Sequence, residues 1–177
     1  MQNKNTKNIV FAALFTAIIT IISQIHIHTP FDVPVTLQTF AIALCGFILG
    51  AKWSVCSVTV YILAGAVGLP VFCCFRGGIQ QIFSLNGGFI IGFIFLALFC
   101  GISLKKRGKA VKLGISYVGL FICHLLGVIQ FAIISRVGFL AAFLTASLPF
   151  LIKDMVLIAL ALYIAPKLEN IITKSTK

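Results

Sequence analysis

Long apolar stretches alternate with short polar segments along almost the whole chain. A membrane-spanning helix needs about 20 residues, so a chain of 177 residues has room for about six spans and little else. The pattern predicts helices at about 9–25, 37–49, 53–69, 88–104, 112–134 and 149–165. We therefore predict an all-α integral membrane protein with about six transmembrane helices, forming a single membrane domain over residues 1–177.

One further apolar stretch, at 139–148, is too short to cross a bilayer. Gly138 and Pro149 bound this stretch, and we expect it to form a re-entrant or interfacial piece at the outer surface. Pro149 suits the first turn of the helix that follows, because the missing N–H of proline is not needed there.

Composition supports a membrane protein and excludes a soluble domain. Hydrophobic residues make up 60% of the chain and charged residues only 10%, with a mean hydropathy of +1.15. A soluble domain of this length needs far fewer apolar residues for its one core.

The basic residues predict the orientation in the membrane. With six helices, only Arg76 and Arg136 lie in loops on one side, apart from Lys153 within a helix. The other side carries Lys4, Lys7, Lys52, Lys105, Lys106, Arg107, Lys109, Lys112, Lys167, Lys174 and Lys177. The positive-inside rule therefore places both termini in the cytoplasm.

The net charge of +11 then needs no nucleic acid as a partner. The cluster at 105–109 is instead a topology anchor that contacts anionic lipid of the bilayer.

Acidic residues are rare, and one of them stands inside an apolar run. The chain has only Asp32, Asp154 and Glu169. An ionised residue near the centre of a membrane helix costs roughly 2.5–3.5 kcal/mol, and such residues usually mark a functional site. Asp154 is therefore the leading site candidate. Its neighbour Lys153 is not expected to pair with it by default, because adjacent helical residues point about 100° apart.

The predicted topology brings several polar residues to the same outer level as Asp154. Asn86 and Arg76 precede the fourth helix, and Thr36 and Gln38 belong to the loop between the first two helices. Apolar and aromatic residues surround these positions, which is the usual composition of a small-molecule pocket. We expect a small, partly hydrophobic ligand with hydrogen-bonding ends that arrives from outside.

Cysteine and histidine spacing gives little support for catalysis or metal binding. The six cysteines show no C-x-x-C spacing, and His26 and His28 near the end of the first helix make an incomplete metal site. We expect no metal and no cofactor. The chain also has no G-x-x-x-x-G-K-[ST] motif, so ATP-driven transport would need a motor on another chain.

Four segments, in order along the chain, resemble the BioY family, whose members are the biotin-specific S components of energy-coupling factor (ECF) transporters. The first is Val33 to Thr39, followed by Leu49 to Lys52, which is similar to the opening signature of the family. The others are Tyr61 to Phe72, Asn86 to Phe93, and the Leu148-Pro149-Phe150-x-x-x-Asp154 pattern of the last helix.

This resemblance implies a subunit that captures biotin from outside and catalyses no reaction. One membrane coupling protein and two ATPase subunits would drive release into the cytoplasm, and the expected location is the bacterial cytoplasmic membrane, with several passes. By the family pattern Asp154 and Asn86 hold the ureido ring, while aromatic residues wall the rest of the ligand. The small residues Ala13 and Ala17 lie on the helix face that docks the coupling protein in S components.

The chain departs from the family pattern at the cation expected for the biotin carboxylate. Leu157 stands where a lysine is usual, so Lys153 and Arg76 are the two replacements. His124 and Gln130 also stand where aromatic residues are more common. The candidate substrate-binding residues are Asp154, Asn86, Arg76, Lys153, Gln38, Thr36, Gly88, Phe72, Phe89 and His124.

Three alternatives stay open at this point. The same architecture could bind another vitamin or a relative of biotin, because the pocket gains polar residues. A membrane enzyme would use His26, His28 or His124. A stand-alone transporter would move its ligand without any ATPase.

Overall fold

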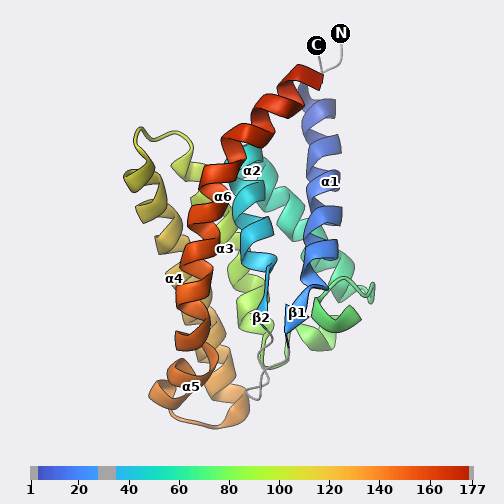
Figure 1. Ribbon diagram of the computed structural model, residues 1–177. Helices are drawn as coiled ribbons and strands as arrows, with labels where there is room; N and C mark the ends of the chain where they lie inside the picture. The colour runs from blue at the N-terminus through green and yellow to red at the C-terminus, as the bar shows by residue number, and fades with distance from the viewer. Residues whose placement is uncertain (1–3, 28–34, 176–177) are drawn as a thin grey trace.

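A computed structural model describes residues 4–27 and 35–175 as a bundle of long helices (Figure 1). Its elements, in order, are α1 (Lys4–Ser23), β1 (His26–Ile27), β2 (Val35–Thr36), α2 (Gln38–Ala66), η1 (Cys73–Phe75), η2 (Ile79–Gln81), α3 (Gly87–Ser103), α4 (Lys109–Ser135), α5 (Phe139–Ala146) and α6 (Leu148–Ser175). Asp32, one of the three acidic residues, and His28, one of the histidines considered for catalysis, lie outside the described residues.

Helix α2 folds back on itself at Gly50. This residue has φ 73° and ψ 172°, which is not helical, and a positive φ is a conformation that glycine adopts without strain. The side-chain amide of Gln38 donates to the hydroxyl of Tyr61, 23 residues further on, at 2.6 Å. A straight helix would hold these residues about 35 Å apart. The two legs, 38–49 and 51–66, therefore correspond to the two separate helices predicted at 37–49 and 53–69.

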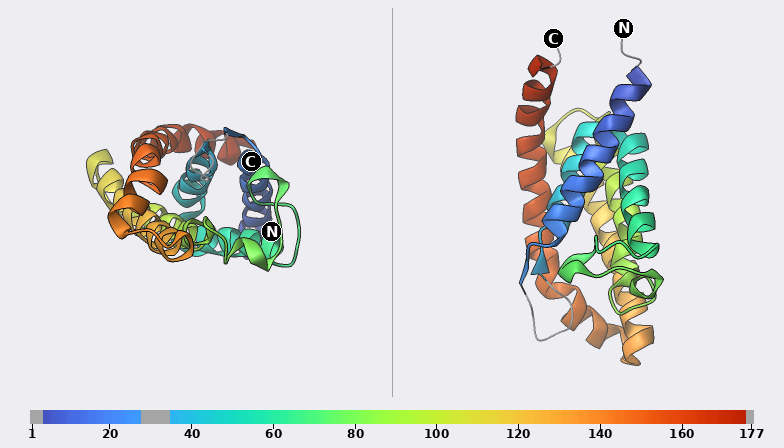
Figure 2. Two further views of the ribbon diagram at one scale, coloured as in Figure 1. Left: turned by 90° about the horizontal axis from the view of Figure 1, so that it is seen from below. Right: turned by 90° about the vertical axis from the view of Figure 1, so that its right-hand side faces the viewer.

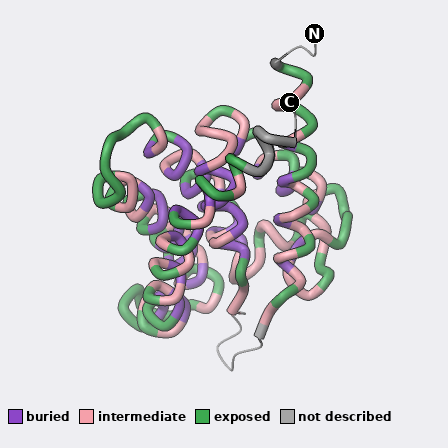
Figure 3. The backbone as a smooth tube through the Cα atoms, turned by 45° about the horizontal axis from the view of Figure 1, so that its top comes forward, coloured by how far each residue is buried: buried purple, intermediate pink, exposed green. Residues whose placement is uncertain are grey.

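The first leg of α2 lies inside the bundle. Seen from the end that carries α5, the other helices surround this leg (Figure 2, left). Its residues Ala41, Ile42, Ala43 and Cys45 have no exposed surface. The outer faces of the surrounding helices carry exposed apolar residues, as a surface in contact with lipid does, while the buried positions face inward (Figure 3).

The other predicted helices are present, with shifts at their ends. The predictions at 88–104, 112–134 and 149–165 correspond to α3, α4 and α6, and the short apolar piece at 139–148 is α5. Helix α6 continues to Ser175, ten residues beyond its predicted end at 165, and contains Pro166. Pro149 lies in its first turn, as predicted.

A short strand pair interrupts the helical pattern within the described residues. β1 and β2 pair antiparallel, with His26 opposite Thr36 and Ile27 opposite Val35. Two-residue strands carry no period-2 pattern that the sequence could reveal, so this element was missed.

Four described helices, α1, α2, α4 and α6, are long and apolar enough to cross a membrane, and α3 is a shorter apolar helix. The start of α1, the end of α6 and the basic 104–108 connection lie at one end of the bundle, while the strands and α5 lie at the other (Figure 1). This arrangement fits the grouping of loops on which the positive-inside argument rests. The count of six spans and the cytoplasmic termini stay predictions.

Close helix contacts at glycine hold α3 against its neighbours. A Cβ added to Gly101 would lie 2.2 Å from the backbone nitrogen of Ala51, so the reversal of α2 packs directly on α3. A Cβ at Gly88 would lie 2.2 Å from the backbone oxygen of Leu126 on α4. Small residues at such positions let membrane helices approach closely, which strengthens their packing.

We predict that Gly101→Ala destabilises the protein, because the added methyl group meets backbone that cannot move aside. Overpacking of this kind costs about 1–3 kcal/mol, which thermal unfolding of the purified protein in detergent would register as a lower Tm. Gly114→Ala is the matched control, since a Cβ there meets nothing within 4 Å. Equal Tm values for Gly101→Ala and the parent would contradict the close contact of α2 with α3.

Candidate functional site

A cavity opens at the end of the bundle that carries β2 and α5. Its volume is about 1140 Å³, counting the part that opens to solvent. Every part of the chain from β2 to α6 contributes to its lining. The lining residues are Thr36, Gln38, Thr39, Phe72, Cys73, Cys74, Arg76, Gln81, Ser84, Asn86, Phe89, Ile90, Phe93, Leu120, Cys123, His124, Ala146, Phe150, Lys153 and Asp154.

The cavity lining includes every predicted substrate-binding residue except Gly88. Gly88 lies instead against Leu126 of α4, so its position supports a role in helix packing and not the predicted ligand contact. Gln130, which the sequence suggested as a pocket residue, is also absent from the lining. Its side-chain amide donates to the backbone oxygens of Ile82 at 2.8 Å and Ser84 at 2.7 Å. These bonds attach the loop that precedes α3 to α4.

Asp154 lies at the centre of a buried polar network and is 5% exposed. The ammonium Nζ of Lys153 lies 2.8 Å from its Oδ1, and Nε2 of His124 lies 3.3 Å from its Oδ2. The expectation that adjacent helical residues would not pair was therefore wrong here. The four-carbon lysine side chain is long and flexible, so it curves around the helix to its neighbour.

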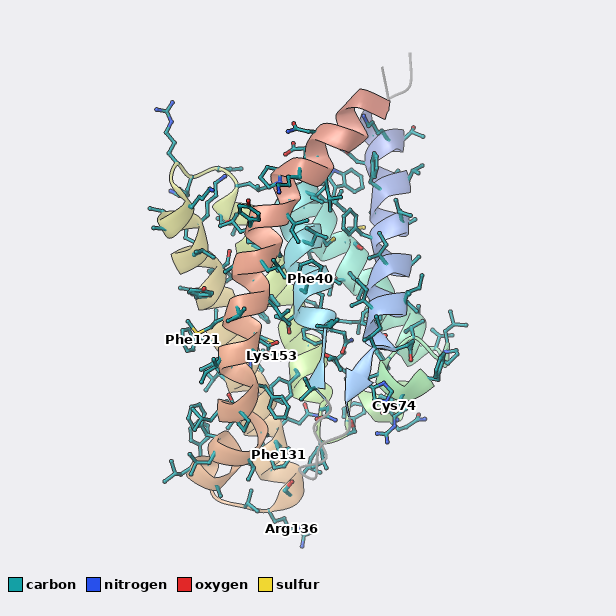
Figure 4. All side chains as sticks on the ribbon, in the orientation of Figure 1. Phe40, Cys74, Phe121, Phe131, Arg136 and Lys153 are labelled. Atoms are coloured by element: carbon teal, nitrogen blue, oxygen red, sulfur yellow. The ribbon has the colours of Figure 1, made fainter. Side chains whose placement is uncertain are left out.

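Lys153 is also fixed by the strand pair. Its Nζ donates to the backbone oxygen of Thr36 at 2.7 Å, and Figure 4 shows Lys153 beside β2 in the middle of the bundle. The ammonium group therefore points inward and does not reach out to the membrane surface.

His124 continues the network to the start of α6. Its Nδ1 lies 2.8 Å from the hydroxyl of Ser147. A carboxylate only accepts hydrogen bonds, so Nε2 donates to Asp154. In the neutral ring, Nδ1 then accepts from the Ser147 hydroxyl.

Gln38 and Thr36 form the polar edge beside this network. The hydroxyl of Thr36 lies 3.3 Å from Oε1 of Gln38, to which it donates, while the amide nitrogen of Gln38 bonds to Tyr61. Both ends of the Gln38 side chain are therefore oriented by neighbours.

Aromatic residues wall the cavity. Phe72 packs edge-to-face on Tyr61, with ring centroids 5.4 Å apart, and Phe89 packs in the same way on His124 at 5.6 Å. Phe150 is buried nearby. These contacts fix the rings, so the walls are formed before any ligand enters.

The loop between α2 and α3 forms the mouth. Arg76 is exposed and lines the cavity, and it makes no ion pair with any described residue. Asn86 lies at the entrance of α3, where its backbone oxygen accepts from Phe89 and Ile90. Cys73, Cys74, Gln81 and Ser84 of the same loop were missed from the sequence, although the polar Gln81 and Ser84 stand close to Asn86 in the chain.

Comparison with known proteins identifies the family of the chain. The sequence model of the BioY family matches residues 1–174. The chain belongs to the BioY family.

Two curated relatives cover almost the same length. The probable biotin transporter BioY of Pyrococcus horikoshii is 38% identical over 164 residues, which are 93% of this chain and 97% of the relative. The biotin transporter BioY of Thermotoga maritima is 34% identical over 166 residues, with the same coverage of both chains.

A solved structure has the same fold. The crystal structure at 2.1 Å of the S-component for biotin from an ECF-type ABC transporter superposes with a TM-score of 0.88 and 26% identity, over 96% of this chain and 94% of that one. These relatives are named as transporters and not enzymes, so the BioY fold argues against a catalytic role for His26 or His124.

Proposed function

We propose that this BioY protein is the substrate-binding subunit of an ECF-type transporter and captures biotin in the cavity from the outer face. The observation that carries the proposal is the buried Asp154 network at the inner end of an aromatic-walled cavity, in a chain with the fold of a biotin S-component. The predicted location is the bacterial cytoplasmic membrane.

The proposed deep site holds the ureido ring of biotin. A ureido group offers two N–H donors and one carbonyl acceptor, and a carboxylate with its several lone-pair positions can accept from an N–H while it contacts Lys153 and His124. The amide of Asn86 is the proposed second partner. Thr36 and Gln38 would border the ring, and Phe72, Phe89 and Phe150 would contact the apolar remainder.

We assign the biotin carboxylate to Arg76. Lys153 already contacts Asp154 at 2.8 Å and the Thr36 oxygen at 2.7 Å, so a ligand carboxylate would have to compete with both. Arg76 lies at the mouth and is exposed, and a guanidinium matches a carboxylate with two parallel hydrogen bonds.

Energy for release would come from other chains, namely one membrane coupling protein and two ATPases. The outer face of α1 supports a docking role, because Ala13 and Ala17 lie one turn apart and are both exposed. Such small residues allow close approach of another helix.

Asp154→Asn should weaken biotin binding by roughly 10- to 150-fold, the equivalent of the 1.5–3 kcal/mol of a hydrogen bond to a charged group. Equilibrium binding of labelled biotin to purified protein would measure this change. Glu169→Gln is the matched control, because Glu169 is an exposed carboxylate outside the cavity lining. Normal affinity in Asp154→Asn would refute the site, and binding of another vitamin in preference to biotin would refute the substrate.

Arg76→Ala should weaken the binding of biotin but leave the affinity for neutral biotin amide nearly unchanged. Lys153→Met should weaken both ligands, because it disturbs Asp154 and the position of β2. Titration of each variant with both ligands separates the two cations, and Arg107→Ala, an exposed arginine outside the cavity, is the control. The opposite pattern would assign the carboxylate to Lys153.

Ala13→Trp and Ala17→Trp should abolish biotin uptake by cells that co-express the coupling protein and ATPases, while biotin binding to the purified subunit persists. The large ring would hold a docking helix away from α1. Val118→Trp, at an exposed position on α4, should leave uptake intact. Uptake by vesicles that contain this subunit alone would instead favour a stand-alone transporter.

A further inference from the structure

The mouth of the cavity contains a cluster of side chains that the proposed function does not use. A ring nitrogen of His26 and the Sγ atoms of Cys73 and Cys74 all lie within 4.8 Å of one another. Cysteine spacing predicted no metal site, because these residues belong to β1 and η1 and meet only in the folded chain. We propose that His26, Cys73 and Cys74 bind one Zn²⁺ ion.

The two sulfurs are spaced almost as a zinc site requires. They lie 3.4 Å apart, and two thiolates at a Zn–S distance of 2.3 Å in a tetrahedron lie about 3.8 Å apart. The turn that brings them together has φ 62° at Cys74 and φ 53° at Phe75. Two consecutive left-handed residues other than glycine are rare, and such strain is concentrated at ligand clamps and other functional sites.

The hydrogen bond of His26 assigns Nε2 as its proposed zinc ligand. Its Nδ1 lies 2.8 Å from the backbone oxygen of Gln24, to which it can only donate, because a carbonyl oxygen only accepts. This bond leaves the lone pair of the neutral ring on Nε2, and metal-bound histidines commonly donate their other N–H to a carbonyl in this way.

Gln24 also holds the cysteine turn in place. Its Oε1 accepts from the backbone nitrogen of Phe75 at 2.9 Å, and its Nε2 donates to the backbone oxygen of Phe72 at 3.1 Å. One residue therefore positions both the histidine and the turn, as partners around a metal site do.

Charge favours a divalent, thiophilic ion. Two thiolates, one neutral imidazole and Zn²⁺ sum to zero, which suits the partly buried position.

The proposed ion has three protein ligands and keeps a fourth position open. Cys73 and Cys74 line the cavity, so the open position borders the ligand space, as in zinc sites that hold an exchangeable water. The ion would also join β1 to η1 across the mouth. His26 pairs with Thr36, whose oxygen binds Lys153, so the metal site and the Asp154 network share the same strand pair.

The test uses the purified full-length protein, reduced and free of biotin, so its outcome is independent of the proposed function. Co²⁺ serves as the spectroscopic probe for zinc. We expect one equivalent to bind with a sulfur-to-cobalt charge-transfer band and tetrahedral visible bands, and Zn²⁺ to displace it. Zn²⁺ should also raise the Tm, because it binds the folded chain.

Three variants test the ligand set. The double change Cys73→Ser and Cys74→Ser should remove the charge-transfer band and the rise in Tm. His26→Ala should weaken Co²⁺ binding by more than the 10- to 100-fold typical of losing an outer partner. Cys56→Ser, an exposed cysteine elsewhere on α2, should bind as the parent does. Absence of the band in the reduced parent, or its persistence in the double variant, would overturn the site.

Discussion

The buried carboxylate of Asp154 is the constraint around which the open end of the bundle is arranged. A charge removed from water must be matched by an opposite charge and hydrogen bonds. Lys153 of α6 and His124 of α4 provide them, and Ser147 at the junction of α5 with α6 bonds to His124. Because Lys153 also binds the Thr36 oxygen, the same network holds the strand pair against α6. Satisfying one charge thus positions four parts of the chain around a single cavity.

The reversal at Gly50 supplies the second requirement, a polar edge that reaches this charge. The first leg of α2 lies inside the bundle and begins at Gln38 beside the cavity, and its return leg brings Tyr61 back to the same level. Tyr61 then orients Gln38 through its hydroxyl and Phe72 through its ring. Close contacts at glycine residues of α3 hold this helix against α2 and α4.

Much of this arrangement could be predicted because it depends on local pattern. The lengths of the apolar stretches predicted the helices, and the interruption at Gly50-Ala51-Lys52 separated the two legs of α2. The single acidic residue in an apolar run indicated Asp154 as a site residue. The pattern does not give contacts that depend on side-chain reach, on the crossing of helices or on the path of loops. Whether Lys153 turns toward Asp154 is a matter of rotamer, Gly88 faces α4 because of the helix crossing, and His26 meets Cys73 only through the path of two loops. No periodicity in the sequence predicts such contacts.

The charges of the cavity also determine how a ligand would be oriented in it. Around Asp154 the lysine cation and the carboxylate cancel, so the deep end favours an uncharged head group with N–H donors over an anion. At the mouth, Arg76 is exposed and makes no ion pair with a described residue, so it attracts negative charge. A ligand with a neutral hydrogen-bonding ring, an apolar middle and a terminal carboxylate matches this order from inside to outside. Biotin has that order, and a ligand with its charge on the ring would meet the reverse of what the cavity offers.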